Sequence, residues 1–567
     1  MRHNFIYLLI VLLVFLFACR NTDIETVTTL APPVSGQGNI VHSSAEGGEW
    51  PFVYSHNIGS TPKDVYFIFT NPTYTTFSSD INVQSNSYYP SNSNEISSDS
   101  LNVNDGNIET SDHPINAIPD YISEFNNHPP PLIYKDDDLG TMQLNLEEVL
   151  PPQLAVVGDP EVFNESIDND TVNSKCRATR DLSSDISLNI WVADADFTGG
   201  SCGADCMTTS MAEAFLDKFL WDGTSDIYGW VTNMIGGPWG SHSYNNLIPA
   251  TSKNTIDILF YDIPAIAGGT IIGYFHAKDN YLVGSEPTSN QRLIFYMDSV
   301  LAATASGGDG WHISDDYPAL VLSTLSHEFQ HMIHFYQKPV LRASGASSQD
   351  WLNEMSSLMS EDLMSSKLEV NGPRGVTHSD FSAGSSGNGD GRLPGYIYYN
   401  DESAVIWDAF YSYSVNYALG AYLLRNFGGA NFLKHLVQSP FTNTGAIDYA
   451  LSQMGYDFNF SDILQRWGVS VLLSDQLDTS QYYRYNTGVS FDTNMGTTTY
   501  QIGSINMYNY TIFGQTGPKT VSISDLPDLN YHKAASNVLV KAGTQLTGTK
   551  EWTIKMGRDI KLSVVLK

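Results

Sequence analysis

Basic residues are scarce in this sequence of 567 residues. Lysine and arginine together number 28, against 61 aspartates and glutamates, which gives a formal net charge of −33 at pH 7. Nucleic acids and anionic membrane surfaces are themselves negatively charged, so they would repel such a chain. The shortage of positive charge therefore argues against both as partners.

Near its start the chain lacks a hydrophobic run long enough for a comfortable membrane span. Residues 5–17 form a shorter uncharged run after a basic start, as in the hydrophobic region of a signal peptide. The run ends at Leu16-Phe17-Ala18-Cys19, which resembles a bacterial lipobox. We expect residues 1–18 to be a lipoprotein signal peptide, and the exported protein to be anchored through a lipid on Cys19, facing the periplasm or the cell surface. Ordinary secretion, with release from the cell, is the alternative.

Cysteine is scarce too, since only Cys176, Cys202 and Cys206 follow Cys19. In an oxidising compartment two of the three could pair, which leaves one thiol over. Cys202 and Cys206 are close in sequence, and Cys176 is an alternative partner. We expect a structural role for Cys176 rather than a role as a latency switch.

The length predicts two to four domains, because one hydrophobic core serves at most about 300 residues. Composition changes along the chain suggest where the boundaries fall. We predict a flexible tether over 19–48, a β unit over 49–78, a low-complexity and proline-rich linker or propeptide over 79–178, a mixed central domain over 179–477, and a C-terminal β domain over 478–567.

The central region alternates between strand and helix patterns. Apolar runs predict strands over 187–192, 257–262 and 292–297, and an amphipathic pattern predicts a helix over 207–221. A later series of helical patterns follows, over 348–362, 404–427, 431–437, 445–454 and 461–473.

The most informative stretch is His327-Glu328-Phe329-Gln330-His331. Apolar residues recur at helical spacing around it, Asp315 and Asp316 suit a helix start, and Pro339 suits its end. On a helix, residues four apart project from one face, so His327 and His331 can bind one metal ion while Glu328 acts on a water bound to it. The simpler reading is an exposed helix that carries two histidines by chance.

Two imidazoles need a third protein ligand to complete a catalytic zinc site. A third histidine six residues after His331 is missing, because Gln337 stands there. His334 is only three residues on, and we interpret it as a flanking residue. Glu354, 23 residues beyond His331 in Trp351-Leu352-Asn353-Glu354, is the candidate carboxylate ligand. Glu361 follows two turns later and could orient one of the histidines.

These two motifs together resemble the gluzincin peptidases, and most closely the hyicolysin-type secreted neutral metallopeptidases, over roughly residues 181–475. The resemblance implies an α+β multidomain protein in which a zincin-like catalytic domain, made of a small sheet, the active-site helix and a helical lobe, is flanked by β-rich regions. It also implies that a sheet edge pairs with the substrate backbone. The cofactor would be Zn²⁺, bound by His327, His331 and Glu354.

Asn416-Tyr417-Ala418-Leu419-Gly420-Ala421 resembles the gluzincin aminopeptidase helix whose tyrosine donates a hydrogen bond to the oxyanion. Tyr417 is accordingly our candidate donor, with Tyr411 and His378 as substitutes. Glu328 would be the general base.

The function implied is a zinc endopeptidase that acts on protein or peptide substrates. The Gly-x-Met-Glu-Asn segment by which aminopeptidases hold the substrate amine is absent before the metal helix. An aminopeptidase on the same scaffold is one alternative. A surface-binding lipoprotein with a vestigial metal centre is another.

Overall fold

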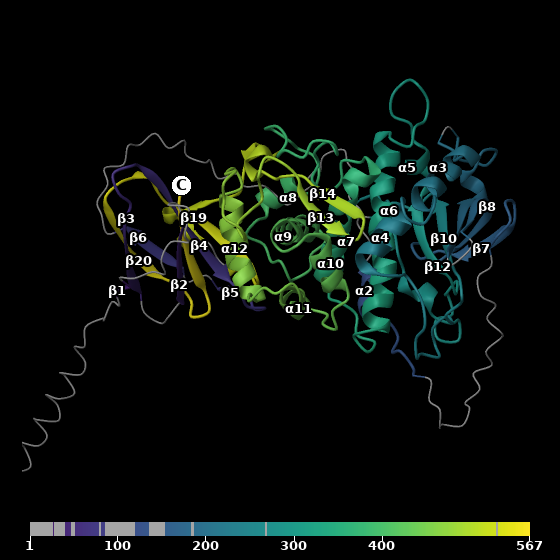
Figure 1. Cartoon of the computed structure of the whole chain (residues 1–567), viewed down its shortest axis with the longest axis horizontal. Coiled ribbons are helices and arrows are strands. Elements are labelled where there is room, and N and C mark those ends of the chain that lie inside the picture. The colour runs from purple at the N-terminus through teal and green to yellow at the C-terminus, as the bar shows by residue number, and fades with distance from the viewer. Residues whose placement is uncertain are drawn as a thin grey trace, which may run out of the picture. The chain divides into compact units, whose positions relative to one another are not determined.

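The computed structural model describes most of the chain, and Figure 1 shows its helices and strands. The described residues are 26–27, 40–46, 51–78, 81–85, 120–134, 154–182, 186–203, 205–266, 269–528 and 531–567. The predicted signal peptide and Cys19 lie outside these ranges. In the described part of the chain, no helix has the length and apolar character that crossing a membrane requires.

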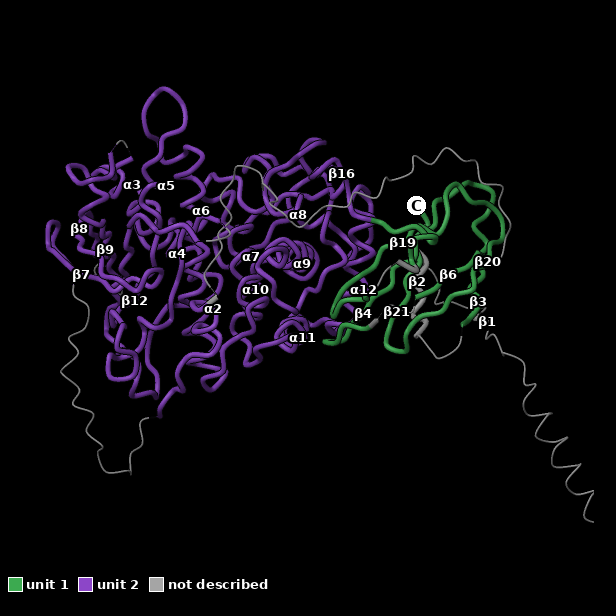
Figure 2. The backbone as a smooth tube through the Cα atoms, turned by 180° about the vertical axis from the view of Figure 1, so that it is seen from behind, with its two compact units in different colours: residues 1–102, 520–567 green, residues 103–519 purple. Residues whose placement is uncertain are grey.

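The chain divides into two compact units, coloured separately in Figure 2. One unit combines residues 1–102 with residues 520–567, and the other comprises residues 103–519. This division differs from two predicted boundaries. The N-terminal and C-terminal β regions belong to one unit, and residues 478–519 belong to the larger unit rather than to a C-terminal domain.

Two larger β-sheets with a common hydrophobic core form most of the smaller unit, and β5 (Phe77–Ser78) pairs with β18 (Tyr531–His532) beside them. Rings of Tyr54, Phe67 and Trp552 meet in that core at centroid distances of 5.3 to 5.9 Å. The first sheet has the order β17-β19-β4-β21-β2: Val521–Ser522, Ser536–Leu546, Lys63–Asn71, Lys561–Leu566 and Ile40–Glu46. The second has the order β1-β3-β20-β6: Thr26–Val27, Phe52–Asn57, Thr549–Lys555 and Asn82–Ser85. Because β1 and β2 fall within 19–48, the tether prediction is wrong for those residues.

A six-stranded mixed sheet lies in the larger unit, in the order β11-β12-β10-β9-β8-β7. These strands are Gly273–Tyr274, Leu293–Asp298, Asn254–Tyr261, Ile186–Ala193, Thr171–Leu182 and Pro160–Asn164. Strands β9, β10 and β12 run parallel and are almost wholly buried, as continuous apolar runs predict, so the three predicted strands are confirmed. β7 and much of β8 lie within residues 79–178, predicted as a linker or propeptide, and they are ordered strands of this sheet.

The cysteines lie in this unit. Cys202 and Cys206 form a disulfide, and Cys176 lies buried on β8 as a free thiol. Burial, with the nearby charges of Asp257 and Asp159, raises the pKa of the Cys176 thiol to about 12. A protonated, buried thiol fits the structural role expected for it.

Helix α6 (Asp316–Phe335) carries the two histidines through the interior of the larger unit. The Phe329 ring lies 5.0 Å from Phe219 of α3 (Thr209–Phe219) and 5.8 Å from Tyr228 of α4 (Ile227–Ile235). A π-helical turn, Tyr336–Val340, contains Pro339 and ends the helix. α7 (Asp350–Leu368) lies against α6, as Figure 1 shows.

Further helices follow α7, and with the sheet they make the larger unit a mixed α+β structure. They are α8 (Leu393–Tyr398), α9 (Ser412–Asn426), α10 (Ala430–Val437), α11 (Gly445–Gln453) and α12 (Phe460–Leu472). α9 begins eight residues later than the predicted 404. The hairpin of β13 (Phe491–Met495) and β14 (Thr498–Ile502) joins this unit, because Tyr500 donates to the carbonyl of Trp230 at 2.7 Å.

Candidate metal centre

The side chains of His327, His331 and Glu354 converge between α6 and α7. Both imidazoles are buried, and their ring centroids lie 4.8 Å apart on successive turns of α6. The Glu354 oxygens lie 3.2 Å from Nε2 of His327 and 3.5 Å from Nε2 of His331. One ligand atom from each of the three residues lies within 4.8 Å of the others. In the part of the chain that the structure describes, this is the one such group of three that could hold a metal ion.

The outer nitrogen of each imidazole is held by a second partner. Nδ1 of His327 lies 2.7 Å from Oε1 of Glu361, whose other oxygen accepts a hydrogen bond from Ser323 at 2.7 Å. Nδ1 of His331 lies 3.1 Å from Oδ1 of Asn353. Since Nδ1 is occupied in both rings, Nε2 of each is turned toward Glu354, which is the arrangement that orients metal-binding histidines.

The charges in the cluster also suit a cation. Burial alone would lower the pKa of His327, but hydrogen bonds to Glu354 and Glu361 outweigh it and raise the pKa to about 10. Burial lowers the pKa of His331 to about 4, because it outweighs the negative charge of Glu354, which raises that pKa. Burial would raise the pKa of Glu354, yet the two histidines bring it below its usual value. A divalent cation bound between these groups would take the place of a proton on His327.

The donor set fits zinc, which binds imidazole nitrogen and carboxylate oxygen and keeps an open position in catalytic sites. Glu328, the next residue on α6, is also fully buried. Its charge acts on His327 and on Tyr413. His334 does not join the cluster, because its Nε2 lies 2.8 Å from Oγ of Ser348, as expected for a flanking residue.

The predicted hydroxyl donor has a rival on the same helix. Tyr417 is buried on α9, where its charged neighbours are Asp362, Arg425 and Arg374 rather than the cluster. Tyr413, one turn earlier on the same helix, has Glu354, Arg392 and Glu328 around it. Tyr413 is thus the tyrosine of α9 on which the charges of Glu354 and Glu328 act.

The two substitutes have other described surroundings. The surroundings of the Tyr411 hydroxyl are Glu402 and Asp408. His378 lies in the loop between α7 and α8. The residue that the sequence analysis missed altogether is Arg392, whose guanidinium carbon lies 5.1 Å from the centre of the Tyr413 ring. In the sequence, the only sign of Arg392 is that it is an isolated basic residue in a glycine-rich loop.

A small pocket of about 10 Å³, room for about one water molecule, adjoins the cluster on the His331 side. Residues from four separated parts of the chain line it: Asn126, Phe275, Ala277, His331, His334, Phe335, Pro339, Ser347, Ser348 and Asn353. A space of this size beside a proposed metal ligand suits a bound water molecule.

Comparison with known proteins supports this picture. A family model described as Peptidase M30 matches residues 168–510, which include α6 and α7. The neutral metalloprotease ShpI of Staphylococcus hyicus is 24% identical over 273 residues, or 47% of this chain and 51% of that protein. The chain thus spans about half of the length of this relative.

The buried His-His-Glu group and these matches together place the chain in a family of metallopeptidases. More particularly, the chain belongs to the peptidase M30 family. Its resemblance to the hyicolysin-type metallopeptidases, predicted from the two motifs, is confirmed.

Proposed function

We propose that the chain is a zinc-dependent endopeptidase with a zincin-like catalytic domain, and that His327, His331 and Glu354 are the metal ligands. The observation that carries this proposal is the convergence of two imidazole Nε2 atoms on one buried carboxylate, with each Nδ1 held from behind. Such a constellation can hold a metal ion with its imidazole ligands oriented from behind.

Bound zinc would polarise the scissile carbonyl and acidify a water molecule. Glu328 accepts the proton of that water and passes it to the leaving amine, a role that suits a buried carboxylate next to the ligands. The Tyr413 hydroxyl donates a hydrogen bond to the carbonyl oxygen as negative charge develops on it. Arg392 keeps a positive charge close to the same hydroxyl.

Metal content and casein digestion test the proposal directly. We expect the purified full chain to hold about one zinc ion, to digest casein, to lose that activity in a chelator, and to regain it with added zinc. A chain that binds zinc and digests nothing would instead favour a binding protein with a vestigial metal centre.

Blocked peptides separate endopeptidase from aminopeptidase action. An endopeptidase cleaves an internally quenched peptide whose amino terminus is acetylated, whereas an aminopeptidase needs the free amine. We expect the acetylated and free peptides to be cleaved at similar rates. Cleavage of the free peptide alone would refute the endopeptidase assignment.

A further inference from the structure

A short segment that precedes the family match lies against the metal centre. It consists of α2 (Asp120–Asn127) and the residues that follow to 134, and we call it the strap segment. The match to Peptidase M30 begins only at residue 168. The strap segment nevertheless belongs to the larger unit.

The strap segment contacts elements on both sides of the cluster. Oγ of Ser123 donates to Oδ1 of Asp350 at 3.1 Å, at the first residue of the helix that carries Glu354. One helical turn on, Asn126 bonds to residues just after β11, which is the edge strand of the six-stranded sheet. The strap segment therefore bridges the ligand helix and the sheet edge.

The contact of Asn126 imitates a paired peptide strand. Its Nδ2 donates to the carbonyl of Phe275 at 2.9 Å, and its Oδ1 accepts from the amide of Ala277 at 2.8 Å. The two groups flank His276, an extended residue between the end of β11 and the 3-10 helix Ala277–Asn280. A carbonyl and an amide on either side of one extended residue are also the groups by which a strand binds an added extended peptide. A side-chain amide offers the same donor and acceptor as a peptide group, so Asn126 occupies these positions itself.

This contact lies at the metal centre rather than at a remote edge. Asn126, Phe275 and Ala277 line the same pocket as His331 and Asn353. A substrate that paired with the edge at Phe275 and Ala277 would thus run beside a proposed metal ligand, and would have to take the place of Asn126.

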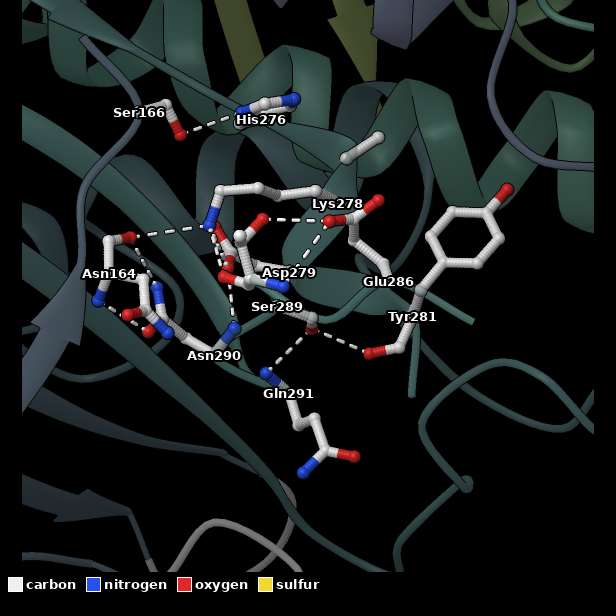
Figure 3. A network of polar contacts seen from close by, with 12 residues as sticks. Asn164, Ser166, His276, Lys278, Asp279, Tyr281, Glu286, Ser289, Asn290 and Gln291 are labelled. Atoms are coloured by element: carbon white, nitrogen blue, oxygen red, sulfur yellow. Dashed lines mark hydrogen bonds and ion pairs between the residues drawn. The ribbon is translucent and has the colours of Figure 1, made fainter. Parts of the chain in front are cut away.

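The residues that follow β11, from Phe275 to Tyr281, form the platform on which the strap segment lies, and hydrogen bonds hold this platform in place (Figure 3). Nζ of the buried Lys278 donates to Asp279 and to the carbonyls of Asn164 and Thr288, at 2.9 to 3.2 Å. From this platform the Tyr281 hydroxyl donates to the carbonyl of Pro130 at 3.0 Å. The edge therefore keeps its shape whether Asn126 or another peptide group is bound to it.

The strap segment itself is only shallowly buried. Ile122 is fully buried, but Tyr121, Ile133 and Tyr134 are 43 to 56% exposed. A segment held mainly by hydrogen bonds, with large side chains left in solvent, can leave its platform at a much lower cost than a core helix.

We propose that residues 120–134 are an internal inhibitor, which holds the substrate-pairing edge closed until a substrate or proteolysis displaces it. The inference rests on the proposed peptidase function. It adds that the occupant of the edge is a segment of the same chain, and that the substrate must compete with it as an extended peptide.

Activity measurements on the zinc-loaded full chain test the proposal. Ser123→Ala with Asn126→Ala removes the bridging contacts, and Asn126→Asp keeps the size of the side chain while it turns a second oxygen toward the Phe275 carbonyl. We expect kcat/KM for an acetylated, internally quenched peptide to rise about tenfold in the double variant, mainly through a lower KM. Glu124→Gln, an exposed residue on the same helix, is the control and should match the wild type.

Hydrogen exchange supplies a readout that does not depend on turnover. A peptide hydroxamate bound to the zinc-loaded wild type should speed exchange in residues 120–134, because it displaces the strap segment. Unchanged or slower exchange in residues 120–134 with the hydroxamate bound would overturn the inference. So would an unchanged kcat/KM in variants that fold, provided that the wild type is active. If the wild type shows no chelator-sensitive hydrolysis, the proposed function fails first, which separates the two failures.

Discussion

Each buried imidazole of the metal centre depends on a carboxyl or amide oxygen behind it. Glu361 holds Nδ1 of His327, and Asn353 holds that of His331. We expect Glu361→Gln to lower zinc affinity about 10- to 100-fold, because the ring loses a charged partner that raises its basicity. Competition with a chromophoric chelator measures the change. Glu369→Gln, exposed at the end of the same helix, should have no effect.

We expect Glu328 to transfer the proton of the attacking water molecule, and not to bind the metal ion. The substitution Glu328→Gln keeps the shape of the side chain and removes its basicity, so kcat should fall about 10²- to 10⁴-fold while bound zinc remains near one ion per chain. Peptide hydrolysis and metal analysis on the same sample check both parts. Full activity in this variant would refute the role of Glu328 as general base.

The two tyrosines of α9 provide a matched pair. Tyr413 has Glu354 and Glu328 around it, whereas Tyr417 has Asp362 and Arg425. We expect Tyr413→Phe to lower kcat about 10²- to 10³-fold, the usual cost of one lost oxyanion donor, and Tyr417→Phe to leave kcat within about twofold. The reverse pattern would restore the assignment made from the sequence.

This pair also marks what could be predicted at the residue scale. Helical spacing is enough to bring His327 and His331 together, and the motif around Glu354 supplied the third candidate, because both signals are local. Which turn of α9 faces the cluster depends on how α9 lies on α7, where Gly420 leaves room for the Met359 side chain. No local pattern in the sequence specifies how α9 is rotated and shifted against α7.

At the scale of elements, one buried ion pair joins α7 to α9. Nη1 of Arg425 lies 2.8 Å from Oδ2 of Asp362, with both side chains at most 1% exposed. Arg425→Met would leave the Asp362 carboxylate buried without its partner, so we expect a loss of about 3–5 kcal/mol in the free energy of unfolding. Urea unfolding measures it. Asp401→Asn breaks the partly exposed pair with Lys519 and should cost less than about 1 kcal/mol.

Elements with a continuous apolar character could be predicted, and those with a mixed character could not. β9, β10 and β12 are buried along nearly their whole length, so their apolar runs were sufficient. β8 alternates between buried and exposed residues and is rich in polar side chains. Its place in the sheet comes from pairing with β9 and β7, a tertiary effect that overrides its weak local preference.

At the scale of the whole molecule, the pairing of β4 with β19 and β21 joins residues 63–71 to residues 536–566. Composition indicated β structure at both ends of the chain, but not that the ends share a core. Because each unit has internal contacts of its own, we expect metal removal to affect the stability of the larger unit only.

The last prediction concerns metal, proton and stability together. In the metal-free chain the pKa of His327 is raised to about 10 through Glu354 and Glu361, against the effect of burial. A raised histidine pKa stabilises the folded state fully below the unfolded value of about 6.5, and that contribution is lost as pH rises toward 10. Zinc must displace this proton, so zinc affinity should rise about tenfold per pH unit between about pH 7 and 9.

Calorimetry checks the prediction. At a free zinc concentration fixed at about 1,000 times the Kd at pH 7, binding should add about 4 kcal/mol to the stability of the larger unit at that pH. The difference in Tm between zinc-loaded and chelated protein should grow from pH 7 to pH 9, as affinity rises while the metal-free form loses the His327 contribution. The transition of the smaller unit, which contains none of the three ligands, should stay in place. A zinc effect that shrinks with rising pH would show that His327 does not carry the displaced proton.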